Sequence, residues 1–306
     1  MKKLTGLFTA VTFLLLLSCQ RELSYSTTQA AGVVKSVTDF HAKNRKDQQV
    51  FTFNSASSSI LSASKGAKLH LPSNGFVTQN GNPVSGNIEV SVKEIYTPME
   101  MIFNNMPTTS NGRLLESGGE FQIMISQNNA PLKLAPGNFI KIGIPNIGRA
   151  MQGMEVFNGV ENAIGEVNWV VNPKPGNFVV GDSLLYSNTN LFSDEINWLN
   201  CDKFINEPTV DFTVNPGNAP SGDSTNVFVH LTGRNTVVKM NWVQGLSYFK
   251  SNMLLAVPST IVGISTKKGE LFASVSAANI QNGSSVTMNF LPYTEQQLKN
   301  RLSQLR

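Results

Sequence analysis

Short runs of alternating hydrophobic and polar residues recur along the chain from residue 50 onwards. In GNIEVSVKEI, residues 86–95, Ile88, Val90 and Val92 share one face and polar side chains share the other. The runs VFTF, KLHLP and GEFQIMI have the same period of two, and turn signals such as NGNPVSG and TSNGR separate them. Alternation between Gly, Pro and Asn clusters is typical of half-buried antiparallel strands. The pattern therefore predicts an all-β protein.

The spacing of these runs divides the chain into segments. Many short strands at close spacing imply a sandwich or a barrel, so we predict two β-sandwich modules in series, over residues 50–147 and 208–292. The second resembles an immunoglobulin-like or carboxypeptidase-regulatory-like sandwich. Residues 148–207 are expected to be a connecting segment with short strands.

Residues 293–306 are expected to form a short C-terminal helix. Thr294 can cap it, and Gln297 completes a capping-box pattern. Leu298, Leu302 and Leu305 form one apolar stripe. About three turns are marginal in isolation, so we expect the helix to pack on a sheet edge. The alternative is that an exposed leucine stripe docks a partner protein.

The stretch TTSNGRLLESGGEFQI, residues 108–123, raises the question of a phosphate-binding loop. Such a loop needs a helix N-terminus after its glycines and usually a Lys-Ser/Thr pair. Here a strand pattern follows Gly118 and Gly119, where glycine permits a β-bulge or a close backbone approach. Asn111 and Gly112 tolerate the positive φ of a tight turn. We interpret the stretch as a joint between strands.

The first 18 residues have the organisation of a lipoprotein signal peptide. Lys2 and Lys3 precede an apolar stretch over residues 4–17, which is shorter than the roughly 20 residues of a membrane-spanning helix and fits a secretory leader. The sequence LLSC at residues 16–19 resembles a bacterial lipobox. This resemblance implies that Cys19 becomes the mature N-terminus and carries acyl chains such as palmitate. An ordinary signal peptide with a chance cysteine is the alternative.

A lipid on Cys19 would place the protein in the bacterial cell envelope, as an outer membrane lipoprotein. Two or more acyl chains anchor a protein stably, whereas one is marginal. Residues 19–49 are mostly polar and are expected to be a tether between the lipid and the folded part. Arg21 and Glu22 stand where a surface-export signal would carry an acid-rich run, so the periplasmic or surface face stays open.

Composition and charge limit the classes of partner that the protein is expected to bind. Charged residues make up 14% of the chain, below the roughly 25% of typical soluble domains, and Gly, Asn, Ser and Thr take their place. The formal net charge is +4, from 24 basic and 20 acidic residues. No stripe of basic residues interleaved with aromatics is visible, so we expect no nucleic-acid partner.

The second cysteine is expected to be structural. With Cys19 lipidated, Cys201 has no cysteine left for an internal disulfide. A reactive thiol is usually partly exposed and close to a His, but the surrounding sequence INWLNCDKF contains none. We therefore expect Cys201 to be buried and inert.

Residues for catalysis or metal binding are not grouped in the sequence. His41, His70 and His230 have no His or Cys at ligand spacing. Glu116 and Glu120 flank the double glycine, but in an extended strand they lie roughly 13 Å apart, beyond the roughly 5–9.5 Å of a glycosidase pair. The sequence therefore predicts no catalytic residue, no metal site and no cofactor.

Two short motifs concern surface modification. Asp-Ser-Leu at Ser183 and Asp-Ser-Thr at Ser224 resemble the O-glycosylation acceptors of some Gram-negative envelope proteins. Ser183 and Ser224 are therefore candidate O-glycosylation sites. Trp169, Trp198 and Trp242 could form a stacking platform for carbohydrate, but in such short strand contexts we expect them to pack in the core.

The segments GAKLHLPSNGF, GNPVSGNIEVSVKEIYTPMEMIFNNMPTTSNGRLLESGGEFQI and PLKLAPGNFIKIGIP carry a resemblance. They are similar to a domain of uncharacterised Gram-negative envelope lipoproteins. They also resemble, more loosely, the β-sandwich of zonula-occludens/netrin-receptor-type ectodomains. The resemblance covers residues 50–145, about a third of the chain. It implies a scaffold or interaction module rather than a reaction.

These observations predict a membrane-anchored envelope lipoprotein that acts as a non-catalytic binding or structural module, with a glycan or protein ligand. One alternative is a carbohydrate- or peptidoglycan-processing enzyme, which would require two carboxylates in an aromatic-lined cleft. Another is an accessory subunit of an envelope assembly. The ligand and the oligomeric state stay open.

Overall fold

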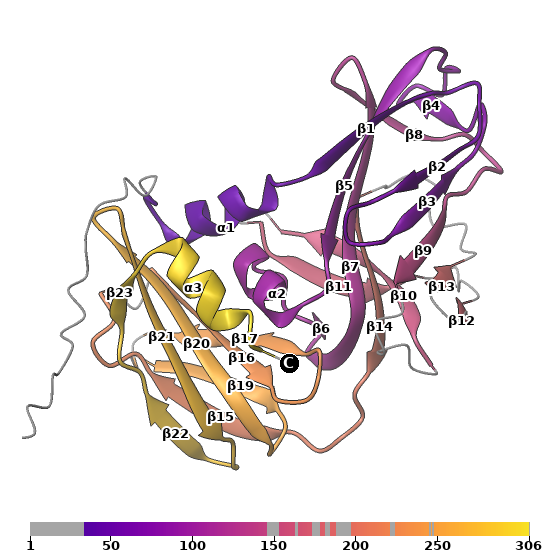
Figure 1. Ribbon diagram of the computed structural model, residues 1–306. Coiled ribbons are helices and arrows are strands. Elements are labelled where there is room, and N and C mark those ends of the chain that lie inside the picture. The colour runs from indigo at the N-terminus through magenta and orange to yellow at the C-terminus, as the bar shows by residue number, and fades with distance from the viewer. Residues whose placement is uncertain are drawn as a thin grey trace, which may run out of the picture. The chain divides into compact units, whose positions relative to one another are not determined.

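Antiparallel strand pairing dominates the computed structural model of the protein (Figure 1). The structure describes residues 34–145, 153–162, 165–172, 178–180, 184–187, 197–220, 224–244, 246 and 248–305. These residues form a mostly β structure of several sheets with three helices. The prediction of a β protein is confirmed. The sequence pattern predicted only one helix, at residues 293–306, whereas the structure has three among the described residues.

The largest sheet has nine strands, and its central strands are those with the clearest alternation. Its main path runs in the order β1-β5-β7-β14-β10-β11, with β4, β6 and β8 attached beside it. The bounds are β1 (Gln49–Asn54), β4 (Phe76–Thr78), β5 (Asn87–Ile95), β6 (Thr109–Ser110), β7 (Arg113–Gln127), β8 (Ala130–Leu134), β10 (Glu155–Glu161), β11 (Val167–Val171) and β14 (Trp198–Phe204).

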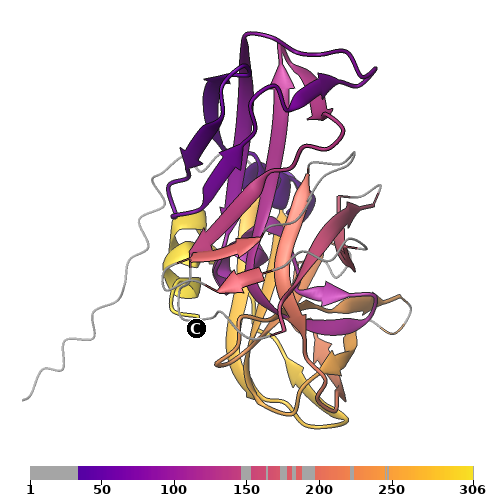
Figure 2. The same ribbon diagram turned by 90° about the vertical axis from the view of Figure 1, so that its right-hand side faces the viewer.

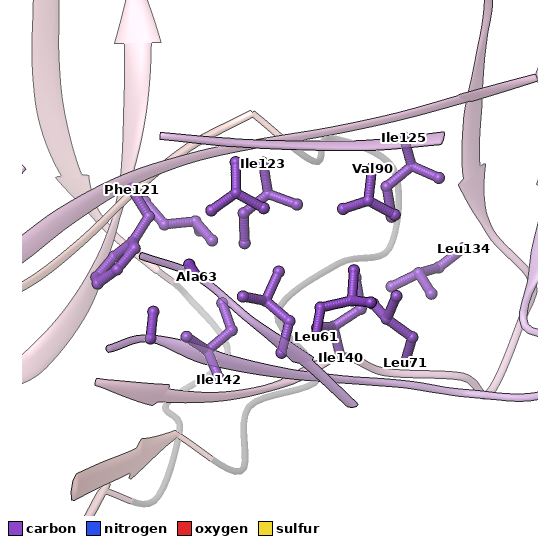
Figure 3. Close-up of a cluster of buried hydrophobic side chains, with 14 of the residues drawn as sticks. Leu61, Ala63, Leu71, Val90, Phe121, Ile123, Ile125, Leu134, Ile140 and Ile142 are labelled. Carbon is purple, nitrogen blue, oxygen red and sulfur yellow. The ribbon is translucent and has the colours of Figure 1, made fainter. Parts of the chain in front are cut away.

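A five-stranded sheet shares a core with this nine-stranded sheet. Its order is β12-β13-β9-β3-β2. The bounds are β2 (Ser59–Ser62), β3 (Lys68–Leu71), β9 (Lys141–Pro145), β12 (Phe178–Val180) and β13 (Leu184–Ser187). Figure 3 shows Val90, Ile123 and Ile125 of the larger sheet facing Leu61 and Ile142 of the smaller one. The alternation thus buries one face of residues 87–91 of β5 and 121–127 of β7, whereas residues 92–95 and 117–121 are buried on both faces.

Two further sheets form the C-terminal part of the chain. One has the order β18-β19-β15-β22 and the other β17-β16-β20-β21-β23. The bounds are β15 (Val210–Asn215), β16 (Thr225–Leu231), β17 (Val237–Lys239), β18 (Asn241–Val243), β19 (Tyr248–Leu254), β20 (Pro258–Lys267), β21 (Glu270–Asn279), β22 (Ser284–Thr287) and β23 (Leu291–Tyr293). Their shared core contains Phe212 and Phe249 from the first sheet, and Val229 and Ile261 from the second.

Three helices occupy the junction between the N-terminal and C-terminal sheets (Figures 1 and 2). They are α1 (Val37–Arg45), α2 (Pro98–Asn104) and α3 (Glu295–Leu302). A separate hydrophobic cluster contains residues of all three helices together with β5, β7, β10, β11, β16, β20 and β21. Residues 33–306 accordingly form one compact unit. Within the described part of the chain, no helix has the length and apolar character needed to cross a membrane.

Helix α1 lies within residues 19–49, for which a polar tether is expected, and it corrects that expectation for residues 37–45. Residues 19–33 of the expected tether lie outside the described residues. Ser36 caps it by accepting a hydrogen bond from the Asp39 amide at 3.0 Å. Phe40 is fully buried and His41 is 3% exposed, so this segment belongs to the folded unit. The sequence reading missed the helix because its apolar residues are few and their burial depends on distant sheets.

Helix α2 was missed as well, although the sequence contains its signal. Thr97 and Glu100 form a capping box, with Pro98 in the first turn. Asn105 ends the helix in the left-handed conformation, at φ 52°. The short pattern T-P-x-E therefore indicated a helix start inside a region read as strands.

The segment 148–207 is more than a connection. Its strand β14 lies between β7 and β10 in the nine-stranded sheet, and its strands β12 and β13 extend the smaller sheet beyond β9. The boundary expected at residue 147 therefore does not coincide with the end of either N-terminal sheet.

Helix α3 confirms the expected C-terminal helix and its Thr294–Gln297 capping box. Leu298 and Leu302 are fully buried in the junction cluster. This burial counts against a leucine stripe that docks a partner protein, because the stripe already packs inside the chain.

We predict that Phe40→Ala lowers the free energy of unfolding by about 3–5 kcal/mol, because it leaves a cavity in the junction. Val50→Ala is the control, since Val50 is 61% exposed and should change stability by no more than about 0.5 kcal/mol. Urea denaturation followed by circular dichroism measures both. Equal, small effects would mean that α1 does not stabilise the fold.

Candidate functional site

A cleft of about 530 Å³ opens between the N-terminal and C-terminal sheets. Its volume lies within the roughly 300–1,000 Å³ of small-molecule sites. One wall consists of the turn after α2 and the β10–β11 hairpin. The other consists of the start of β16, the end of β17, β18 and β19. The lining residues are Asn105, Pro107, Thr109, Val160, Asn162, Glu166, Val167, Asn168, Thr225, Asn226, Lys239, Met240, Asn241, Trp242, Phe249 and Met253.

Aromatic side chains form one side of the cleft. Trp242 and Phe249 are cross-strand partners on β18 and β19, and their ring centroids lie 4.8 Å apart with a tilt of 55°. Trp242 is half-buried, whereas Trp169 and Trp198 lie in the junction core. The expectation of core packing thus holds for those two, but Trp242 also lines the cleft.

One ion pair joins the two walls. The Lys239 ammonium hydrogen-bonds to the Glu166 carboxylate, which also accepts a hydrogen bond from the Asn162 amide at 3.3 Å. Burial favours the neutral acid, but the contacts with Lys239 and Asn162 outweigh it and hold the pKa of Glu166 below its ordinary value. Glu166 is therefore a carboxylate, and its charge is balanced by that of Lys239.

His41 of α1 stands behind the cleft and fixes Asn226. The Asn226 amide donates to His41 Nε2 at 3.0 Å, so Nδ1 carries the proton and donates to the Phe103 carbonyl at 3.0 Å. Burial lowers the pKa of His41 to about 3. This neutral histidine connects α1, α2 and β16, and it is part of the fold rather than a metal ligand.

Arg45 at the end of α1 holds the N-terminal wall in place. Its guanidinium donates to the carbonyls of Asn104 at 2.6 Å, Asn105 at 3.1 Å and Gly165 at 2.5 Å. It also pairs with Glu161 at 3.1 Å. The planar fork of arginine suits several simultaneous acceptors, so one side chain ties the C-terminus of α2 to the β10–β11 hairpin.

The double glycine lies away from the cleft, in a buried polar cluster. Gly119 pairs with Cys201 and Ser117 with Asp202, which leaves Gly118 as the extra residue of a β-bulge. A side chain at Gly119, with φ 148°, would meet the Tyr96 ring at 2.8 Å. The joint between strands lies at Asn111 and Gly112, which form the turn between β6 and β7 with positive φ. The double glycine is instead a bulge inside β7, which runs through it as one strand.

Two acids are buried beside this bulge. Glu120 and Asp202 have no exposed surface, and neither oxygen of Glu120 has a hydrogen-bond partner within the described chain. Asp202 accepts a hydrogen bond from the Asn200 amide at 2.6 Å. Burial raises the pKa of both acids well above the ordinary carboxyl range, and their proximity raises that of Glu120 further. We infer that both are neutral in the folded protein.

The Glu116–Glu120 pair is not brought together as an open site. Glu116 lies 3.8 Å from Arg234, whereas Glu120 is closed off from solvent. Cys201 is buried, as expected, and burial raises the pKa of its thiol. It therefore lacks the thiolate character of a reactive cysteine.

The remaining candidate residues are placed as follows. Ser224 is exposed in a turn and so is accessible to modification. Cys19 and Ser183 lie outside the described residues. His70 and His230 lie on separate sheets, and across the described part of the chain no three His, Cys, Asp or Glu residues are arranged to hold a metal ion.

Comparison with known proteins found no family model and no curated protein that matches this sequence. The resemblance of residues 50–145 to envelope lipoproteins therefore stays a prediction.

We predict that the stability of the wild-type protein carries a penalty from Glu120 that grows as pH rises. Its folded pKa is raised, so unfolding releases a proton above the ordinary carboxyl pKa, and stability falls by at most about 1.4 kcal/mol per pH unit. The free energy of unfolding of Glu120→Gln, relative to that of the wild type, should therefore increase from pH 5 to pH 7. Urea titrations at several pH values measure the difference.

Glu89→Gln is the matched control, because Glu89 is exposed on β5. His41 contributes in the opposite direction, because its lowered pKa makes stability rise between about pH 3 and pH 6.5. This contribution is the same in the variant and the wild type, so it cancels in their difference. A pH-independent difference for Glu120→Gln would contradict a neutral buried acid.

Proposed function

We propose that this protein is a membrane-anchored envelope lipoprotein whose folded part is a non-catalytic binding module. The observation that carries the proposal is the cleft between the sheets. It combines a volume suited to a small ligand with neutral amides, an aromatic side and a balanced ion pair. A site built from such groups can hold a polar ligand without performing acid–base chemistry on it.

We further propose that the folded part consists of two β-sandwich modules in series, locked together by the helices. Each end of the chain has a core to which two sheets contribute, which is the packing of a sandwich. The resemblance of residues 50–145 to envelope lipoproteins agrees with this architecture for the first module.

The anchor in this proposal is the lipid on Cys19, and the leader with its LLSC sequence supports it. Because the folded part begins at Ser36, the N-cap of α1, the tether runs only from Cys19 to Ser36. It therefore spans 36 − 19 = 17 residue steps. At about 3.6 Å per residue, this segment reaches at most about 60 Å. The module would therefore stay close to the outer membrane, on a shorter tether than the sequence alone suggested.

An enzyme that processes carbohydrate or peptidoglycan is less well supported. Glycoside hydrolysis uses two carboxyl groups, one of them with a raised pKa. Among the described residues that line the cleft, Glu166 is the single carboxyl group, and its pKa is lowered. Glu120 and Asp202 have raised pKa values but no access to solvent.

Metabolic labelling with a palmitate analogue tests the anchor. We expect the wild-type protein to be labelled and to fractionate with the outer membrane, and Cys19→Ala to be unlabelled and to leave that fraction. Cys201→Ala is the matched control and should behave as wild type. An unlabelled wild-type protein, or labelling that survives Cys19→Ala, would contradict the proposal. Protease treatment of intact cells then distinguishes the surface from the periplasmic face.

A further inference from the structure

We propose that the cleft binds a neutral saccharide, with a sugar ring against Trp242 and its hydroxyl groups bonded to the surrounding amides. This inference rests on the proposed function as a binding module and specifies its ligand class. Three properties of the cleft support it: its aromatic side, its amides and its charge.

On the aromatic side of the cleft, Trp242 packs against Phe249. Phe249 is 2% exposed and supports the indole from the core side, while Trp242 itself remains half-buried on β18, at the edge of its sheet. A supported, rigid indole offers a flat apolar surface at little entropic cost. The apolar face of a pyranose ring matches such a surface.

The polar lining consists mainly of amides. Asn162, Asn168, Asn226 and Asn241 come from both walls. Each amide has a donor group and an acceptor oxygen, and a sugar hydroxyl likewise donates and accepts. Asn226 is held by His41 and Asn168 by Asn111, at 3.0 and 2.9 Å. The amides of Asn226 and Asn168 are thus oriented before a ligand arrives, which reduces the entropic cost of binding.

The charge of the lining favours a neutral ligand. Among the described residues of the cleft, Lys239 and Glu166 are the charged ones, and they neutralise each other. A site for phosphate or another anion would need an excess of cationic groups or free backbone amides. An anionic ligand would also have to approach the Glu166 carboxylate.

An extended peptide is the competing occupant. Both β11 and β18 are edge strands of their sheets, and a peptide could add to either through backbone hydrogen bonds. That mode would make no use of the amide lining or of the half-buried Trp242 indole, so a saccharide accounts for more features of the cleft.

Isothermal titration calorimetry tests the inference with the purified full-length protein in a detergent that lacks a sugar headgroup. The probes are chitotriose, maltotriose and cellotriose, with pyrophosphate and the peptide (Thr-Val)₃ as competitors of other classes. The variants are Trp242→Ala, Trp242→Phe and Asn241→Ala, and circular dichroism checks the fold of each. Phe139→Ala is the control, because Phe139 is 46% exposed outside the cleft.

We expect at least one trisaccharide to bind and to change the emission of the partly exposed Trp242. Trp242→Ala should weaken binding by more than tenfold, Trp242→Phe less, and Asn241→Ala by about three- to tenfold. Phe139→Ala should bind as wild type.

The inference would be overturned if none of the three trisaccharides binds at about 10 mM, a concentration at which even weak binding is detected. Binding that is unchanged in Trp242→Ala and Asn241→Ala would do the same. Binding of pyrophosphate or the peptide alone would also overturn it, but would leave the binding module intact. Loss of the lipid anchor, in contrast, is detected by palmitate labelling and does not affect this experiment.

Discussion

Burial of the helices at the junction is the constraint on which the rest of the structure depends. The apolar faces of α1, α2 and α3 are buried against strands of both pairs of sheets. Phe40, Phe103 and Leu298 share one cluster with Phe228 and Val262 from the C-terminal part. Backbone hydrogen bonds accompany this core, because buried amides need partners. The Thr108 amide donates to the Val237 carbonyl at 2.8 Å and that of Ser117 to the Asn235 carbonyl at 3.0 Å. Apolar packing and backbone hydrogen bonds therefore both hold the N-terminal sheets against the C-terminal sheets at the junction.

The cleft is a consequence of this junction. Its two walls belong to different sheets, so their separation is set by the packed helices and by the contacts that cross between them. Arg45 ties the N-terminal wall to α2, and the pair Lys239–Glu166 ties the walls to each other. A pocket held in this way is largely formed before its ligand binds, which is typical of small-molecule sites.

Local sequence patterns predicted those elements that local forces determine. Alternation identified β5 and β7, the Asn111–Gly112 pair identified the turn between β6 and β7, and the capping box identified α3. Helix α1 was missed because its burial depends on residues more than 180 positions away, such as Phe228. The cleft could not be predicted at all, since its lining comes from segments between Asn105 and Met253 that meet only in the folded chain. The sequence did single out Trp242, but gave no reason to separate it from Trp169 and Trp198.

Native-state hydrogen exchange tests most directly whether the junction holds residues 33–306 together as one unit. Exchange is measured by mass spectrometry at increasing, sub-denaturing urea concentrations. The account predicts that amides of α1, α2 and β17 become exchangeable with the same opening free energy as those of β7 and β20. Separate opening of the N-terminal and C-terminal sheets, or rapid exchange of α1 without urea, would contradict it.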